Sequence, residues 1–243
     1  LNKNILFLIG DKNKNPLNLP LLCKTRKNNN NIIFNFTRMR HMHLVYYLQK
    51  NKDINFNEKK DICIWRGSNT GKRHNIANRF DLVDKFINYN TKKIDIAFSS
   101  NAKVNGEIVG NIIKNSNKNL FRKALNIKEL LEYKYLISIE GFDVSSGLKW
   151  MLYSNSLVLM PKPQNFSWIM EDKLIPNVHY IELNNDFSNL EEQLNWCNKN
   201  QLKCIEISKN ATRYMEQFLD IDKEIKLEKM VLERYLQNVI LES

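Results

Sequence analysis

Short, almost wholly apolar runs alternate with helix-like stretches along most of this sequence. The runs that we expect to be strands are 62–65, 94–98, 135–139, 157–160 and 179–183. The stretches with helical spacing between them are 76–89, 127–131 and 148–153. Strands that are apolar at nearly every position are typical of a parallel sheet with helices on both faces. The pattern therefore predicts an α/β fold whose ligand lies beyond the carboxyl ends of the strands.

The two ends of the chain differ from this repeat. Two further strand candidates, 5–9 and 32–36, come first, and three helical stretches at about 188–199, 201–218 and 222–240 come last. A polar connection at 51–60 separates the first strands from the repeat. We therefore place a domain boundary there, with residues 1–50 on one side and residues 51–243 on the other.

The net charge of +11 is unevenly spread. Residues 1–122 hold 23 basic and 8 acidic side chains, so the second half is slightly acidic. Such a charge suits nucleic acid, an acidic membrane or a phosphorylated ligand. Because the excess is mostly lysine scattered among asparagine, without interleaved aromatic residues, nucleic-acid binding is the weakest of these interpretations. The apolar runs are all too short for the roughly 18 residues that a membrane span requires.

Cysteine usage and the start of the chain bear on the compartment. The four cysteines, Cys23, Cys63, Cys197 and Cys204, have no paired spacing, which favours buried free thiols over disulfides. The sequence shows no signal peptide and begins with Leu1, so we expect a fragment or a processed product. Together these features favour the cytoplasm, with a secretory lumen as the alternative if a signal has been lost.

The segment WRGSNTG at 65–71 is the first candidate for ligand binding. It follows a strand and precedes a helix, and its glycines and hydroxyls would let the backbone turn tightly around an anion. Arg66, Arg73 or Arg79 would neutralise that anion. The segment lacks the GK[ST] of a Walker loop, and an ordinary strand-to-helix turn is the alternative interpretation.

The segment EGFDVSSGLKW at 140–150 repeats this arrangement after the next strand. Ser145 or Ser146 is the expected N-cap, and Lys149 lies in the first helical turn. A capped helix without a ligand is the alternative. Asp11, which follows the first strand, is a candidate general base or a simple turn residue.

Metal binding has little support. His41 and His43 alternate, but no cysteine or carboxylate shares their spacing. The Asp220-Ile221-Asp222 run resembles a DxD motif, but it lies between two helices, where an aspartate N-cap explains it better.

These segments, in this order, resemble the family 90 glycosyltransferases. The match rests on WRGSNTG (65–71), EYKYLISIEGFDVSSGLKWMLYSNSLVLMPKP (132–163) and SWIMEDKLIPNVHYIELNNDFSNLEEQLNW (167–196). Weaker support comes from residues 10–26 and from Arg40-His41. The resemblance implies a GT-B architecture of two Rossmann-like halves, with residues 51–243 as the nucleotide-sugar donor domain and residues 1–50 as the last part of the acceptor domain.

The resemblance also implies roles for particular residues. Asp11 takes the place of the catalytic base, Ser68 that of a nucleotide contact, and Arg79 or Arg73 that of the diphosphate-binding arginine, with Arg79 preferred. The small-residue donor loop falls on Phe142, Asp143, Val144, Ser145 and Ser146. The Rumi-type protein O-glucosyltransferases of this family have an arginine where this chain has Gly147. Lys149 would therefore supply the missing charge, although its ammonium group is less well directed than a bidentate arginine.

The function implied is an inverting, metal-independent transfer of a hexose or pentose from a UDP-sugar. The acceptor would be a hydroxyl of a glycan, a lipopolysaccharide-type molecule or a protein, with peripheral membrane association left open, and no cofactor besides the donor is expected. A catalytically inactive relative that binds a glycan or a partner is the alternative. A nucleic-acid-binding module, suggested by the charge alone, is the third hypothesis.

Overall fold

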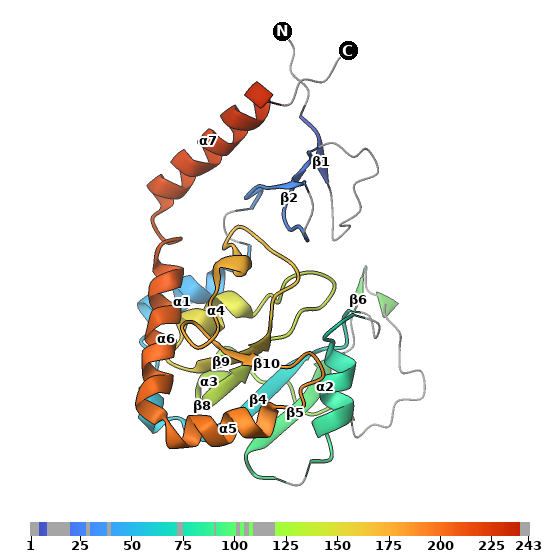
Figure 1. The fold of residues 1–243 in the computed structure, drawn as a ribbon, viewed down its shortest axis with the longest axis vertical. Helices are drawn as coiled ribbons and strands as arrows, with labels where there is room; N and C mark the ends of the chain where they lie inside the picture. The colour runs from blue at the N-terminus through green and yellow to red at the C-terminus, as the bar shows by residue number, and fades with distance from the viewer. Residues whose placement is uncertain are drawn as a thin grey trace.

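A computed structural model of the chain describes residues 5–8, 20–27, 30–37, 40–71, 75–89, 91–100, 103–104, 107–108 and 120–238. Its centre is a five-stranded sheet in which all strand pairs are parallel (Figure 1). The strands are β4 (Lys60–Ser68), β5 (Ile94–Ser100), β8 (Tyr133–Ile137), β9 (Leu157–Pro161) and β10 (Ile181–Leu183). The predicted α/β fold with a parallel sheet is therefore confirmed.

The strand order places the reversal of the chain path between β4 and β8. Across the sheet the order is β10-β9-β8-β4-β5, so the chain first adds β5 on one side of β4 and then builds outward on the other side. This is a doubly wound, Rossmann-like order, and its switch point is where such sheets bind ligands. The register pairs Ile64 of β4 with Leu136 of β8, which brings the carboxyl ends of the two strands together.

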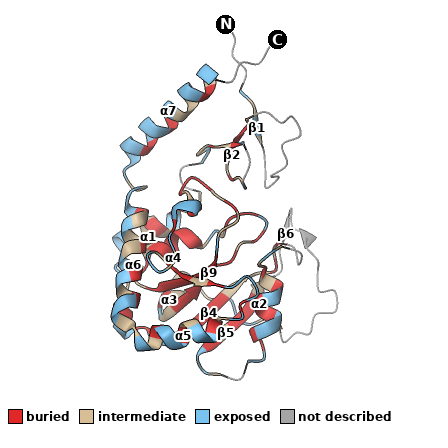
Figure 2. Ribbon diagram, viewed as in Figure 1, coloured by how far each residue is buried: buried red, intermediate tan, exposed pale blue. Residues whose placement is uncertain are grey.

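Alternate side chains of the strands enter two separate hydrophobic clusters. On β8, Tyr135 and Ile137 face one cluster, whereas Leu136 faces the other. The first cluster is covered by α2 (Arg79–Phe86), α5 (Leu190–Lys199) and the first half of α6 (Gln201–Glu216). The second is covered by α1 (His43–Lys50), α3 (Ile127–Leu131), α4 (Leu148–Tyr153) and the second half of α6. Figure 2 shows the buried strands between these two helical layers.

Helix α1 has no counterpart in the sequence prediction. Its Val45 and Leu48 are buried in the second cluster, together with Ile64 and Leu136 of the large sheet. Although α1 precedes the polar connection at 51–60, its apolar side chains thus belong to the core of the large sheet. The domain boundary at this connection stays a prediction.

A small parallel sheet lies apart from the large one and carries the first strands of the chain. Its strands are β1 (Phe7–Leu8), β2 (Leu22–Cys23) and β3 (Ile32–Ile33), in that order. A two-stranded antiparallel ladder of β6 (Lys103–Val104) and β7 (Glu107–Ile108) follows β5.

The last helix, α7 (Ile221–Asn238), extends beyond the other helices to the small sheet (Figure 1). The Tyr235 hydroxyl lies 3.3 Å from the backbone nitrogen of Leu6, which donates to it, and Asn35 Nδ2 donates to Glu228 at 3.1 Å. The final helix therefore connects to the first strands of the chain.

The four cysteines, Cys23, Cys63, Cys197 and Cys204, are buried and free, as predicted.

Candidate functional site

The loops that leave β4 and β8 at the switch point form the candidate site. Residues 69–78 lead from β4 to α2, and residues 138–147 lead from β8 to α4. Both loops were predicted to bind an anion, and the fold brings them into contact. At the contact, Gly71 has a φ of 90°, and a Cβ on Gly71 would lie 2.9 Å from the carbonyl oxygen of Gly141. Only glycine combines that backbone conformation with that close approach.

Arg79 is the first residue of α2, and its guanidinium connects the two loops. It donates to the carbonyl oxygens of Ser68 at 3.0 Å, of Ile139 at 3.2 Å and of Glu140 at 3.2 Å, and to the hydroxyl of Thr70. Desolvation lowers the pKa of Arg79 to about 10, so the side chain stays cationic at neutral pH. Arg79 thus places a positive charge beneath both loops while it holds their backbones together.

The two helices that follow the loops begin differently. At α2, the side chain of Asn78 accepts hydrogen bonds from the backbone of Phe80 at 3.1 Å and of Asp81 at 2.9 Å. At α4 the N-cap is Gly147, and no side chain caps the helix. The prediction that Ser145 or Ser146 is the N-cap is therefore wrong. The backbone carbonyl of Ser145 accepts from the Leu148 amide instead, at 3.2 Å, so a turn of the chain replaces the side-chain cap.

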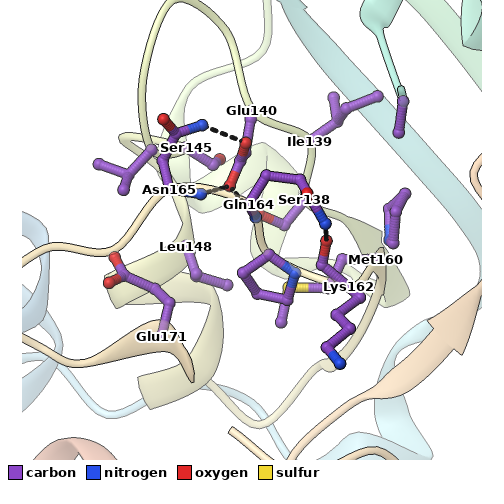
Figure 3. A pocket seen from close by; sticks show the side chains of 14 residues that line it. Ser138, Ile139, Glu140, Ser145, Leu148, Met160, Lys162, Gln164, Asn165 and Glu171 are labelled. Carbon is purple, nitrogen blue, oxygen red and sulfur yellow. Dashed lines mark hydrogen bonds between the residues drawn. The ribbon is translucent and has the colours of Figure 1, made fainter. Parts of the chain in front are cut away.

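A pocket opens between the loop after β8 and the loop after β9 (Figure 3). Val144 and Ser145 of the predicted donor loop line it, together with Ala77, which lies two residues before Arg79. The other lining residues come from the ends of β8 and β9, from the start of α4 and from the segment around Glu171: Ser138, Ile139, Glu140, Leu148, Met160, Pro161, Lys162, Pro163, Gln164, Asn165 and Glu171.

Two carboxylates hold the walls of this pocket in place. Glu140 accepts hydrogen bonds from the backbone of Gln164 and of Asn165, each at 2.9 Å, and from the Asn165 side chain (Figure 3). Glu171 accepts from the Ser167 hydroxyl at 2.7 Å. Burial raises the pKa of both carboxyl groups. The sequence analysis missed both residues, because a glutamate that fastens a loop has no distinguishing neighbour in sequence.

Asp143 and Lys149 contact the N-terminal segment. Asp143 accepts from Arg40 at 2.9 Å and forms an ion pair with Lys24 at 3.2 Å. The Lys149 ammonium donates to the carbonyl oxygen of Arg40 at 3.0 Å. Desolvation lowers the pKa of Lys149 to about 8, and the nearby Glu171 carboxylate opposes this shift. Asp143 thus joins the loop after β8 to Arg40, and Lys149 joins the start of α4 to it.

The structure brings together only part of the predicted site. Ser68, Arg79, Val144 and Ser145 surround the contact of the two loops and the adjoining pocket. Phe142 and Ser146 of the donor loop are exposed. Asp11 and Arg73 lie outside the described residues.

The described part of the chain contains no group of three or more histidine, cysteine, aspartate or glutamate side chains arranged to hold a metal ion. The Asp220 side chain accepts from the Lys223 backbone at 3.0 Å, which confirms that it caps a helix. None of the described helices is both long and apolar enough to span a bilayer.

A doubly wound parallel sheet with glycine-containing loops at its switch point defines the chain as a Rossmann-like α/β protein. The sequence model for glycosyl transferase family 90 matches residues 34–240, and the chain belongs to this family. The resemblance found in the sequence is thereby confirmed.

The chain is also similar to individual proteins. The chain is 32% identical to the O-glucosyltransferase LpsA of Dichelobacter nodosus over 221 residues, which are 89% of this chain and 62% of that protein. It is also 32% identical to the uncharacterized protein 179R of Invertebrate iridescent virus 6 over 101 residues, or 39% of this chain and 8% of that protein. A solved glycosyltransferase from Rickettsia africae ESF-5 aligns with a TM-score of 0.42 at 11% identity, over 88% of this chain and 64% of that one. The chain thus spans less than two thirds of LpsA.

Proposed function

We propose that this chain transfers a hexose or pentose from a UDP-sugar to a hydroxyl group of a glycan, a lipopolysaccharide-type molecule or a protein, with inversion and without a metal. The observation that carries the proposal is the half-buried cation of Arg79 at the β4/β8 switch point of a chain that belongs to family 90. We further propose a GT-B arrangement, in which the large sheet binds the donor and the small sheet belongs to the acceptor side.

In this mechanism Asp11 removes the proton from the acceptor hydroxyl. The oxygen attacks the anomeric carbon from the side opposite the diphosphate, and the bond between that carbon and the diphosphate oxygen breaks. UDP leaves with the bonding electrons, and the configuration at the anomeric carbon inverts.

The departing diphosphate gains negative charge, which cations in a desolvated site stabilise. Arg79 supplies one such charge beneath the loops, and Arg73 or Lys149 would supply another. Ser68 would contact the nucleotide, and the loop of Phe142, Asp143, Val144, Ser145 and Ser146 would enclose the donor sugar. The four buried thiols support a reducing, cytoplasmic location for this reaction.

Release of UDP from a panel of UDP-sugars, with and without EDTA, tests the proposal. We expect turnover of one donor, undiminished by EDTA, with the anomeric configuration of the product inverted by NMR. The Asp11→Asn variant should lose at least about a hundredfold in rate, as expected for loss of a general base. The control is Asp186→Asn, because Asp186 is an exposed aspartate that is not among the residues of the candidate site. Full activity of Asp11→Asn would refute the assigned base, and loss of turnover in EDTA would refute metal independence.

A catalytically inactive relative that binds a glycan or a partner is the second candidate. UDP that binds in a calorimeter, with no UDP-sugar turned over by the same protein, would support this candidate over the enzyme.

A further inference from the structure

A second pocket lies beside the small sheet and differs in composition from the pocket in Figure 3. Its walls come from the small sheet and the segment after it, from the start of α4 and from the segment after β9. Its volume is about 260 Å³. Pockets for drug-sized ligands measure roughly 300–1,000 Å³, so this pocket suits a single ring-sized group.

Aromatic side chains form one wall of this pocket. The ring of Phe36 lies 6.2 Å from that of Phe7 and 5.1 Å from that of Phe34, and Phe34 lies 6.5 Å from Trp168. The planes of neighbouring rings are inclined by 57° to 78°, so these rings do not stack face to face on one another. Phe7 is 55% exposed and Phe36 is 47% exposed. Neighbouring exposed rings indicate a binding surface, since such apolar area is costly to leave in water.

The cations of the pocket are already engaged within the protein. Asp143 accepts from Arg40 at 2.9 Å and pairs with Lys24 at 3.2 Å. Lys149 donates to the Arg40 carbonyl at 3.0 Å and interacts with the Glu171 carboxylate. A charged ligand would compete with these ion pairs, whereas an uncharged ligand leaves them intact. The pairing therefore favours an uncharged ligand.

Helix α7 fixes two further side chains of the lining. Asn35 donates to Glu228 at 3.1 Å, and the indole of Trp168 donates to Glu224. Both glutamates are buried. Because these contacts already hold the amide and the indole in place, the pocket has its shape before a ligand arrives, and binding costs little ordering entropy.

The lining also offers partners for the hydroxyl groups of a ligand. Thr37 and Ser167 contribute hydroxyls, and Asn35 contributes an amide. Mostly apolar and aromatic walls with a few such polar groups are typical of small-molecule sites. A sugar ring matches this combination, because its C–H face packs on aromatic groups and its rim forms hydrogen bonds.

The two pockets adjoin at the start of α4. Leu148 lines the pocket in Figure 3, and its neighbour Lys149 lines the second pocket. Glu171 of the first pocket accepts from the hydroxyl of Ser167, which lines the second. A ligand in the second pocket therefore lies next to the proposed donor site.

From this juxtaposition of exposed rings and internally paired charges we propose that the second pocket binds an uncharged sugar ring of the acceptor. The C–H face of the ring packs on Phe36, and Thr37 takes up one of its hydroxyl groups. The acceptor is then a glycan rather than a protein side chain without a sugar. This inference rests on the proposed function, because it names the substrate class of the acceptor side.

Saturation-transfer NMR titrations of the full chain test the inference. The uncharged probes are the methyl glycosides of glucose, galactose and mannose. Glucuronate and glucose 6-phosphate carry a carboxylate or a phosphate on a comparable ring. We expect at least one methyl glycoside to bind about tenfold more tightly than both charged sugars, with the strongest saturation on one face of its ring. Added NaCl should leave this affinity unchanged, because salt screens only charged contacts.

Two variants of Phe36 test the role of the rings. Phe36→Ala should weaken the bound methyl glycoside about three- to tenfold. Phe36→Leu keeps apolar volume without a ring and should weaken it in the same direction, which guards against a folding defect of the alanine variant. The control is Trp196→Ala, because Trp196 is a 37% exposed aromatic residue on α5, at the opposite end of the molecule from the small sheet (Figure 1). The control should leave the affinity unchanged.

An affinity for either charged sugar that equals that for the methyl glycosides would overturn the proposal, as would unchanged affinity in both Phe36 variants. The absence of saturation transfer to all three methyl glycosides would also overturn it. Displacement of the methyl glycoside by UDP would assign the pocket to the donor instead.

A separate titration with UDP alone reports on the proposed function. If UDP does not bind, the donor site fails, whereas the methyl glycoside titrations need no UDP and still decide the second pocket.

Discussion

A methyl group added to Gly71 would lie 2.9 Å from the carbonyl oxygen of Gly141, so the two loops of the candidate site touch backbone to backbone. Gly71 follows β4 and Gly141 follows β8, the neighbouring strands at the switch point. The contact leaves no space for a side chain at either position, since a Cβ on Gly141 would lie 2.6 Å from the hydroxyl of Thr70.

The Gly71→Ala variant should therefore be destabilised by about 1–3 kcal/mol, because alanine is strained at a φ of 90° and meets backbone that cannot move aside. Urea unfolding measures the change. Gly147→Ala is the matched control, since its Cβ would meet the flexible end of Met151 and its φ is −81°. We expect a change of less than about 1 kcal/mol for this control. Equal losses in the two variants would contradict the close approach as the cause.

Replacing Arg79 with lysine separates its charge from its hydrogen bonds. A lysine keeps the positive charge but cannot reach the carbonyl groups of Ser68, Ile139 and Glu140 together. We expect Arg79→Lys to lose about 2–3 kcal/mol of stability in urea. The control is Arg122→Lys, at a half-exposed arginine paired with Asp95, for which about 1 kcal/mol or less is expected. An Arg79→Lys protein of unchanged stability that no longer binds UDP would show that the arginine serves the ligand alone.

Lys149 should make the stability depend on pH. Its pKa is about 8 in the folded chain, whereas a fully solvated lysine in the unfolded chain has a pKa of 10.5. Between these values the folded chain has lost a proton that the unfolded chain retains, so the free energy of unfolding rises with pH. The rise amounts to at most about 3 kcal/mol and is complete above pH 10.5.

The difference between wild type and Lys149→Met in urea, measured from about pH 7 to pH 10, isolates this contribution. Lys173→Met is the control, because that side chain is 71% exposed. If the free energy of unfolding changes with pH in the same way for the wild type and for Lys149→Met, Lys149 keeps its proton throughout this pH range.

The ion pair of Asp143 with Arg40 should couple the loop after β8 to the N-terminal segment. Asp143 is 12% exposed at its side chain and Arg40 is 24% exposed. A double-mutant cycle with Asp143→Asn and Arg40→Gln should give a coupling energy of about 1–3 kcal/mol. In the Arg40 variant Asp143 still pairs with Lys24, so this substitution removes only one of its two ion pairs. If the two substitutions change the free energy of unfolding additively, the ion pair does not couple the loop to the segment.

The sequence predicted the large sheet well and the helix α1 not at all. Strands such as Leu157–Pro161 are buried at every position, and a continuous apolar run is typical of a sheet covered on both faces. Helix α1 has no capping side chain at Met42 and contains valine and two tyrosines, so it has weak local signals. Its packing against the large sheet stabilises it, and a contact between distant segments leaves no local pattern in the sequence.

The sequence likewise predicted the two loops of the candidate site but not their contacts with distant residues. The loops were found because glycine and hydroxyl residues after a strand have a local signature, whereas the orientation of Lys149 and the pairing of Asp143 depend on Arg40, which lies 103 residues before Asp143. Asp11 stays a prediction.

The contacts of α7 with the small sheet have a consequence for how the chain is made. Leu6 leaves the ribosome 229 residues before its partner Tyr235, and Asn35 leaves it 193 residues before its partner Glu228. The whole large sheet is therefore synthesised after the strands of the small sheet and before their partner helix exists. During that interval the three two-residue strands of the small sheet lack the contacts that α7 makes with this part of the chain.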